Sequence, residues 1–195
     1  MVAMLLLGAD APAAAGAAIL AVGLMGAGII GAAAAARFWI GIVLALLAGA
    51  GLLLLAQVIG MPPLQDPLWT GLAIAAASFS FAARGALFAR SAAAKGWLIA
   101  VFVVAGEAAI LATASARPGT LPEWLLALLP AQWASMAIAG AWTGTGADVA
   151  GAALIALAGT AAATLLVANL WPRRWPYLVM FSAWLALSAL VYERM

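Results

Sequence analysis

The sequence predicts an all-α integral membrane protein, a single polytopic bundle of transmembrane helices over residues 1–195. Of the 195 residues, 69% are hydrophobic and only 7% are charged, and the mean hydropathy is +1.20. Soluble domains carry about 25% charged residues, so this composition excludes a soluble domain. Several apolar segments reach the roughly 20 residues that a helix needs to cross hydrocarbon, and none shows the alternation of a transmembrane β-strand.

Six apolar segments are predicted to span the membrane, separated by short loops that carry prolines or basic residues. Proline prevents regular helix in the loops at residues 60–67 and 117–122, and residues 89–95 form a basic loop. Tryptophans lie near several of the helix ends, which is typical of the membrane interface. The predicted spans cover residues 13–36, 38–59, 69–89, 96–115, 147–170 and 176–192.

Residues 123–142 leave open an alternative with seven spans. The segment is apolar enough to span, but Pro130 interrupts it and its polar and aromatic residues suit an interface. The positive-inside rule favours six spans with both termini outside, because five basic residues are then cytoplasmic and two are outside, rather than four and three. The cytoplasmic ones are Arg37, Arg90, Lys95, Arg173 and Arg174, and the outer ones are Arg117 and Arg194. We therefore expect residues 121–136 to lie along the outer surface, with Trp124 and Trp133 in the headgroup region.

The stretch WPRRWPY, residues 171–177, is predicted to be a tight cytoplasmic hairpin. Arg173 and Arg174 satisfy the positive-inside rule, and Trp171 and Trp175 suit the interface on either side of them. The simplest interpretation is a topological anchor. Contact with an anionic phospholipid or with a partner protein is the alternative.

Small residues recur every four positions in the first two predicted spans. Such rows let helix backbones approach closely, whether the neighbouring helix belongs to the same chain or to another. The two rows are Gly23, Ala27 and Gly31, and Gly41, Ala45 and Gly49.

Two charged residues fall inside predicted spans and are therefore the candidate functional residues. Arg84 is about 9 Å from the cytoplasmic end of its span, and Glu107 is about 16 Å into the next one, at 1.5 Å per residue. Because the two spans form a hairpin, the simplest interpretation is an ion pair, or a protonated Glu107 bonded to a neighbour. A proton or ion pathway through Glu107 and a polar contact with another subunit are the alternatives.

The absence of histidine and cysteine limits the cofactors and metals that this chain can bind. The chain has no histidine and no cysteine, which excludes His or Cys ligation of haem, iron–sulfur clusters and His-bound metals. Its only lysine, Lys95, falls in a predicted loop, which excludes a Schiff base inside a helix. The sequence has no basic stripe of the kind that binds nucleic acid. We therefore expect no cofactor bound by this chain alone and no nucleic-acid partner.

Three stretches carry a resemblance to a known family: residues 80–106, 142–151 and 184–192. They resemble subunit III of the haem–copper oxidases, which reduce oxygen with electrons from cytochrome c or quinol, over about residues 69–192. The family's histidines are absent here, so no functional residue is carried over. The matching positions are Ala83, Ala86, Leu87, Gly96, Leu98, Thr143, Gly144, Trp184, Leu185, Leu187, Val191 and Tyr192.

The resemblance implies a cofactor-free, non-catalytic subunit that packs beside a catalytic subunit, holds phospholipid and supports assembly or proton entry. We accordingly expect an accessory subunit of a respiratory or other electron-transfer complex in a bacterial inner membrane. The main alternative is a small homo-oligomeric transporter or channel with Glu107 in its pathway. A membrane enzyme using Glu107 and Asp148 is a third hypothesis, for which the sequence offers no nucleophile and base at helical spacing.

Overall fold

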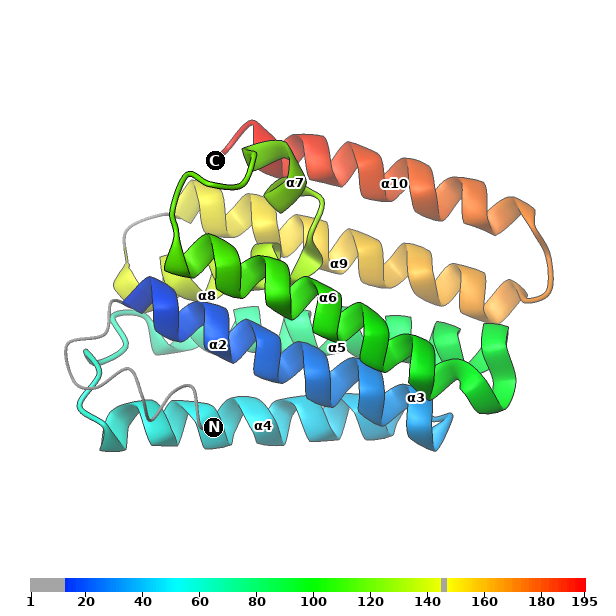
Figure 1. Ribbon diagram of the computed structural model, residues 1–195, viewed down its shortest axis with the longest axis horizontal. Helices are drawn as coiled ribbons and strands as arrows, with labels where there is room; N and C mark the ends of the chain where they lie inside the picture. Colours follow the sequence, from blue (N-terminus) through cyan, green and yellow to red (C-terminus); the bar gives the residue numbers. More distant parts are fainter. Residues whose placement is uncertain (1–12, 145–146) are drawn as a thin grey trace.

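The computed structural model describes residues 13–144 and 147–195, and within them the chain is helical without strands (Figure 1). Six of its helices are long and apolar enough to cross a membrane, which confirms the predicted helical bundle. The elements are α2 (Ala13–Met25), the π-helix η1 (Gly26–Ile30), α3 (Gly31–Ala35), α4 (Phe38–Val58), α5 (Pro67–Ala92), the 3₁₀ turn η2 (Ala93–Lys95), α6 (Gly96–Ala116), α7 (Glu123–Ala127), α8 (Pro130–Thr143), α9 (Ala147–Leu170) and α10 (Trp175–Tyr192).

The long helices run side by side along the long axis of the molecule, with α2, η1 and α3 forming one continuous rod (Figure 1). We call the end of the bundle where α2 begins and α10 ends the terminal end. The other end holds the α3–α4, α5–α6 and α9–α10 turns, and we call it the basic end. Five of the basic residues lie in or beside those turns: Arg37, Arg90, Lys95, Arg173 and Arg174.

The third span is longer than predicted at both of its ends. At its start, the Asp66 carboxylate accepts a hydrogen bond from the Trp69 backbone N–H at 3.1 Å, which caps a helix that begins with proline. At its end, the predicted basic loop at residues 89–95 is instead helix and 3₁₀ turn, because its alanines favour helix. The chain can still reverse at Gly96, where a Cβ would lie 2.5 Å from the Phe88 carbonyl oxygen.

Three glycines from three different helices meet where the first three spans cross. A Cβ on Gly28 would lie 2.9 Å from Cβ of Phe81, and one on Gly41 would lie 2.6 Å from the Gly28 carbonyl oxygen. A Cβ on Gly85 would overlap the Ile29 carbonyl oxygen. We call Gly28, Gly41 and Gly85 the glycine crossing. Here the small residues bring together helices of the same chain, which answers one of the questions that the sequence left open.

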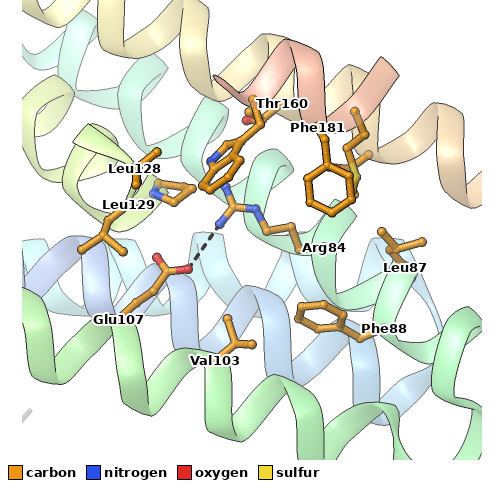
Figure 2. A pocket seen from close by; sticks show the side chains of 13 residues that line it. Arg84, Leu87, Phe88, Val103, Glu107, Leu128, Leu129, Thr160 and Phe181 are labelled. Carbon is orange, nitrogen blue, oxygen red and sulfur yellow. Dashed lines mark ion pairs between the residues drawn. The ribbon is translucent and has the colours of Figure 1, made fainter. Parts of the chain in front are cut away.

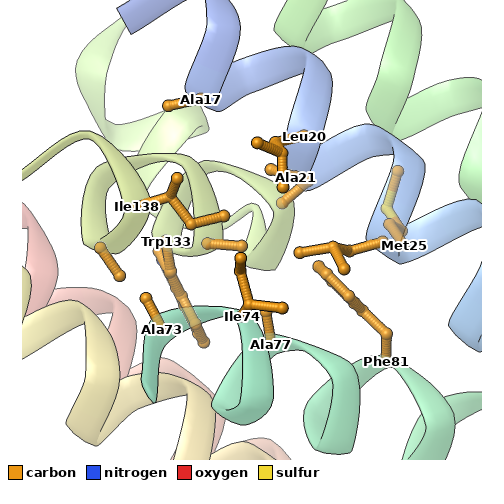
Figure 3. Packing of buried hydrophobic residues seen from close by; sticks show 14 of the residues in the cluster. Ala17, Leu20, Ala21, Met25, Ala73, Ile74, Ala77, Phe81, Trp133 and Ile138 are labelled. Carbon is orange, nitrogen blue, oxygen red and sulfur yellow. The ribbon is translucent and has the colours of Figure 1, made fainter. Parts of the chain in front are cut away.

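The largest buried cluster lies between α2, α5 and α8 (Figure 3). It includes Leu20 and Met25 from α2, Phe81 from α5, and Trp133 and Ile138 from α8, all of them fully buried. α8 therefore belongs to the centre of the bundle, where α2, α5 and α9 surround it.

This placement contradicts the prediction that residues 121–136 lie along the outer surface. Trp124 is 58% exposed, as an interfacial residue would be, but Trp133 is fully buried, so the prediction for Trp133 is wrong. The indole Nε1 of Trp133 donates a hydrogen bond to the Ala127 carbonyl at 2.7 Å. Because the only polar atom of the side chain is thus satisfied inside the protein, the indole does not need the interface.

The segment from α7 to α8 enters the bundle and leaves it at the same end. α6 ends and α9 begins at the terminal end (Figure 1), and α8 has 14 residues. At 1.5 Å per residue α8 is about 21 Å long, shorter than the roughly 30 Å of hydrocarbon in a bilayer. It begins at Pro130 and ends at Gly144, whose φ of 66° is the left-handed conformation that stops a helix. α8 is thus a half-length helix within the bundle rather than a seventh span.

Candidate functional site: an ion pair and a cavity at mid-depth

The two charged residues singled out from the sequence lie next to each other. Arg84 projects from α5 and Glu107 from α6, and Arg84 Nη1 lies 3.9 Å from Glu107 Oε1 (Figure 2). Both side chains are 14% exposed. Glu107 is eleven residues from the start of α6, which places it about 16 Å along the helix and close to its middle. The pair therefore lies deep inside the bundle.

The second carboxylate oxygen of Glu107 binds the beginning of α8. Glu107 Oε2 accepts a hydrogen bond from the Ala131 backbone N–H at 3.2 Å. The first turn of any helix has N–H groups without intrahelical partners and carries a partial positive charge, which a carboxylate stabilises. Sequence reasoning missed this contact, although Pro130, at the first position of α8, was a signal that a helix starts there.

Glu107 balances the charge of Arg84, but the Arg84 guanidinium lacks hydrogen-bond partners for some of its N–H groups. Its guanidinium lies 5.5 Å from the centre of the Phe81 ring, within range of a cation–π contact. At 3.9 Å, its separation from Glu107 is too long for a hydrogen bond. Nη2 is buried and has no hydrogen-bond partner in the described part of the chain. A buried donor without an acceptor is costly, so the bundle holds Arg84 in this position at a cost in stability.

A cavity of about 490 Å³ adjoins the pair. Figure 2 shows its lining side chains arranged around Arg84, which extends between Glu107 on one side and Phe181 on the other. The turn between α7 and α8 closes the cavity near Glu107. The lining residues are Arg84, Leu87, Phe88, Val103, Glu107, Leu128, Leu129, Pro130, Thr160, Thr164, Met180, Phe181 and Trp184.

Hydroxyl groups join α5 to α9 beside this cavity. Ser80 Oγ and Thr160 Oγ1 lie 3.3 Å apart and share a hydrogen bond, and both residues are buried. Thr160 also hydrogen-bonds to the Ala156 carbonyl at 2.8 Å within its own helix. Thr164 lies one turn further along α9 and lines the cavity. This polar seam holds α5, and with it Arg84, in a fixed position against α9.

The predicted anchor residues are far from the ion pair, in the α9–α10 turn at the basic end (Figure 1). Trp171, Arg173, Arg174 and Trp175 are all exposed, and the Trp171 ring contacts the Tyr177 ring edge-on, with 6.0 Å between their centres. None of these four residues lines the cavity beside the ion pair.

Arg90 has a structural contact that the charge count did not predict. Its Nη1 donates a hydrogen bond to the Ala168 carbonyl near the end of α9. Carbonyl groups in the last turn of a helix have no intrahelical partner, and a cation there is stabilising. Arg90 thus ties α5 to α9 at the basic end.

Asp148, the second carboxylate of the enzyme hypothesis, lies near the start of α9, but its side chain falls outside the described part of the structure. Comparison of the chain with protein-family models, with curated proteins and with solved structures finds no match. The comparisons therefore neither support nor contradict the resemblance to oxidase subunit III, and the site must be interpreted from its own geometry.

Proposed function

We propose that this chain is a non-catalytic accessory subunit of a larger membrane complex, in which it packs beside a catalytic subunit. One observation carries the proposal: Glu107 holds the start of α8 through the Ala131 N–H and lies beside Arg84 at the same time. A carboxylate committed to two contacts acts as a structural connection between α5, α6 and α8. It is poorly suited to pick up and release a proton or an ion at every turnover.

The exposed faces of the bundle support the same proposal. α4, α6 and α10 bury less than a quarter of their apolar spans inside the protein, whereas α5 and α9 bury more than half. The exposed helices therefore offer broad apolar surfaces to lipid and to neighbouring subunits.

One of these surfaces carries aromatic rings in mutual contact. The rings of Phe38 and Trp39 at the start of α4 and of Phe79 on α5 lie with their centres 5.4 to 6.4 Å apart. Trp39 is 67% and Phe79 is 42% exposed. Aromatic side chains of this kind are frequent anchors of protein interfaces.

The complex that we propose is respiratory or otherwise electron-transferring and lies in a bacterial inner membrane, in keeping with the resemblance to subunit III. Phospholipid is the expected second partner. The exposed Arg173 and Arg174 in the α9–α10 turn suit the phosphate groups of an anionic leaflet.

The test is purification of the tagged chain from its own membranes in a mild detergent. We expect it to migrate with a larger complex that contains haem or another redox chromophore. Alanine substitutions of Trp39 and Phe79 should release the chain from the complex, while Phe102→Ala, which removes a still more exposed ring on α6, should not. Isolation of the wild-type chain as a homo-oligomer without other subunits would contradict the proposal.

A transporter or channel is the second candidate, and α8 is the observation that favours it. A half-length helix whose N-terminus meets a buried charge beside a cavity is a common feature of transporter substrate sites. In that case Glu107 would lie on the pathway, and reconstituted vesicles containing the chain alone would show a proton or ion flux that Glu107→Gln abolishes.

A further inference from the structure

The cavity beside Arg84 has the size and chemistry of a ligand site that the accessory-subunit proposal does not require. Its volume of about 490 Å³ is within the range of 300 to 1,000 Å³ that is usual for small-molecule sites. Most of the lining is apolar, and its polar side chains are those of Arg84, Glu107, Thr160 and Thr164. Apolar walls with a few converging polar groups are typical of a binding site.

The cavity opens toward the hydrocarbon of the membrane rather than toward water. It lies between α6 and α10, the two helices that are most exposed along their length. Phe181 lines it and is also 53% exposed on the surface of α10. Arg84 is eight residues from the end of α5, about 12 Å by helical rise, so a ligand would have to come from within the bilayer.

The charges around the cavity select a neutral ligand. Arg84 and Glu107 already balance each other, and an anionic headgroup next to Arg84 would bring a second negative charge close to Glu107. A phospholipid would also have to draw its charged headgroup toward the middle of the bilayer. A neutral carbonyl group could instead accept a hydrogen bond from the Arg84 guanidinium without adding charge.

We infer that this cavity binds a neutral, lipid-soluble molecule that carries a carbonyl group, with the carbonyl oxygen accepting a hydrogen bond from the Arg84 guanidinium. The apolar body of the ligand lies against Phe88, Phe181 and Trp184 (Figure 2 shows the first two). Such a carbonyl can belong to a quinone ring or to the ester of an acyl chain. The inference does not rest on the accessory-subunit proposal, because it concerns the purified chain alone.

The test uses the full chain, freed of lipid in detergent, and a fatty-acid methyl ester that carries a photoreactive diazirine. We expect crosslinks to map to α6 and α10 around Val103 and Phe181. Three unlabelled molecules then compete for the site: a decyl-substituted benzoquinone, monooleoylglycerol, and octadecane, which has no acceptor. The two carbonyl compounds should compete at concentrations at least about tenfold lower than octadecane, the effect of one hydrogen bond to a charged donor.

Variants separate the role of Arg84 from that of the cavity. The double variant Arg84→Met with Glu107→Gln replaces the charged donor by a neutral amide without leaving an unpaired charge, and it should remove most of the advantage of the carbonyl compounds over octadecane. Glu107→Gln alone retains Arg84 and should keep that advantage. Val103→Trp, which leaves both charged residues in place, should narrow the cavity and reduce crosslinking, while Phe102→Ala on the same helix should not.

The stronger of the two carbonyl competitors identifies the source of the ligand, a quinone or an acyl ester, and either result supports the inference. Equal competition by octadecane would overturn it, as would crosslinks that map outside the cavity or a double variant that keeps most of the preference for carbonyl compounds. These outcomes are independent of co-purification with a larger complex, so failure of one proposal is distinguishable from failure of the other.

Discussion

Two consecutive residues of α5 belong to regions of opposite character. Gly85 faces the glycine crossing, where backbones of three spans touch and a Cβ would overlap a carbonyl oxygen. Arg84 faces a charged partner 3.9 Å away and a cavity of about 490 Å³. The crossing has no space for an added methyl group, whereas the ion pair lies beside a large cavity. We therefore expect a small increase in side-chain volume at the crossing to lower the stability of the bundle more than the loss of the Arg84 charge does.

The largest effect of a substitution on the free energy of unfolding is therefore expected at the crossing. Gly85→Ala should lower the free energy of unfolding by about 3 kcal/mol, the upper end of the usual range for overpacking, because the Ile29 carbonyl belongs to a rigid helix. Unfolding in mixed detergent micelles measures it. The matched control is Gly71→Ala on the same helix, where a Cβ meets nothing within 4 Å, and where alanine should stabilise the helix by about 0.5 to 1 kcal/mol. Equal effects at the two positions would mean that the crossing is not tightly packed.

The loss of Arg84 is expected to rank second. Arg84→Ala leaves Glu107 without its positive neighbour, but the carboxylate keeps the Ala131 N–H and can take up a proton. We expect a loss of about 1 to 3 kcal/mol, the cost of an unsatisfied buried group, with a lower yield of folded protein in the membrane. Arg84→Lys, which keeps the charge, should recover part of the loss. A loss larger than that of Gly85→Ala would reverse the ranking of the two regions.

A smaller effect is expected where α7 joins α8. Trp133→Phe removes the hydrogen bond from the indole to the Ala127 carbonyl but keeps most of the buried ring, so it should cost about 1 kcal/mol. Trp124→Phe is the matched control, since Trp124 is 58% exposed, and its stability should be unchanged. If the two variants were equally stable, α8 would not depend on this bond for its position.

The sequence was sufficient for the features that depend on length, composition and helical rise. The six spans follow from apolar runs of sufficient length. The proximity of Arg84 and Glu107 follows from a hairpin of two spans, in which the long Arg84 side chain reaches across the difference in depth. The position of α8 could not be predicted in the same way, because a short apolar helix with tryptophans resembles an interfacial helix until the partner of the indole N–H is known.

The cavity and the crossing were also beyond local sequence patterns. Gly23, Gly31, Gly41 and Gly49 stand in regular rows and were identified, but Gly85 stands alone on α5 and was not, although it makes one of the tightest contacts. How closely Gly85 contacts its neighbours depends on where three helices cross in space. The volume of the cavity between α6 and α10 likewise depends on how the helices are placed relative to one another. Neither is encoded in the spacing of residues along one helix.

No effect on assembly or activity is expected for Glu107→Gln, and this variant therefore separates the two proposed functions. The amide oxygen can still accept the hydrogen bond from the Ala131 N–H, and at 3.9 Å no direct hydrogen bond to Arg84 is lost. Because both Glu107→Gln and Glu107→Leu leave the charge of Arg84 without its negative neighbour, Glu107→Gln should lower the free energy of unfolding by about 1 to 3 kcal/mol, and Glu107→Leu, which also removes the acceptor, should lower it by about 1 kcal/mol more. Assembly into a larger complex and the activity of that complex should be unaffected by Glu107→Gln, because the contact that positions α8 persists. A Glu107→Gln protein that assembles fully but loses most activity would show that the carboxylate itself is needed, and the transport function would then become the better proposal.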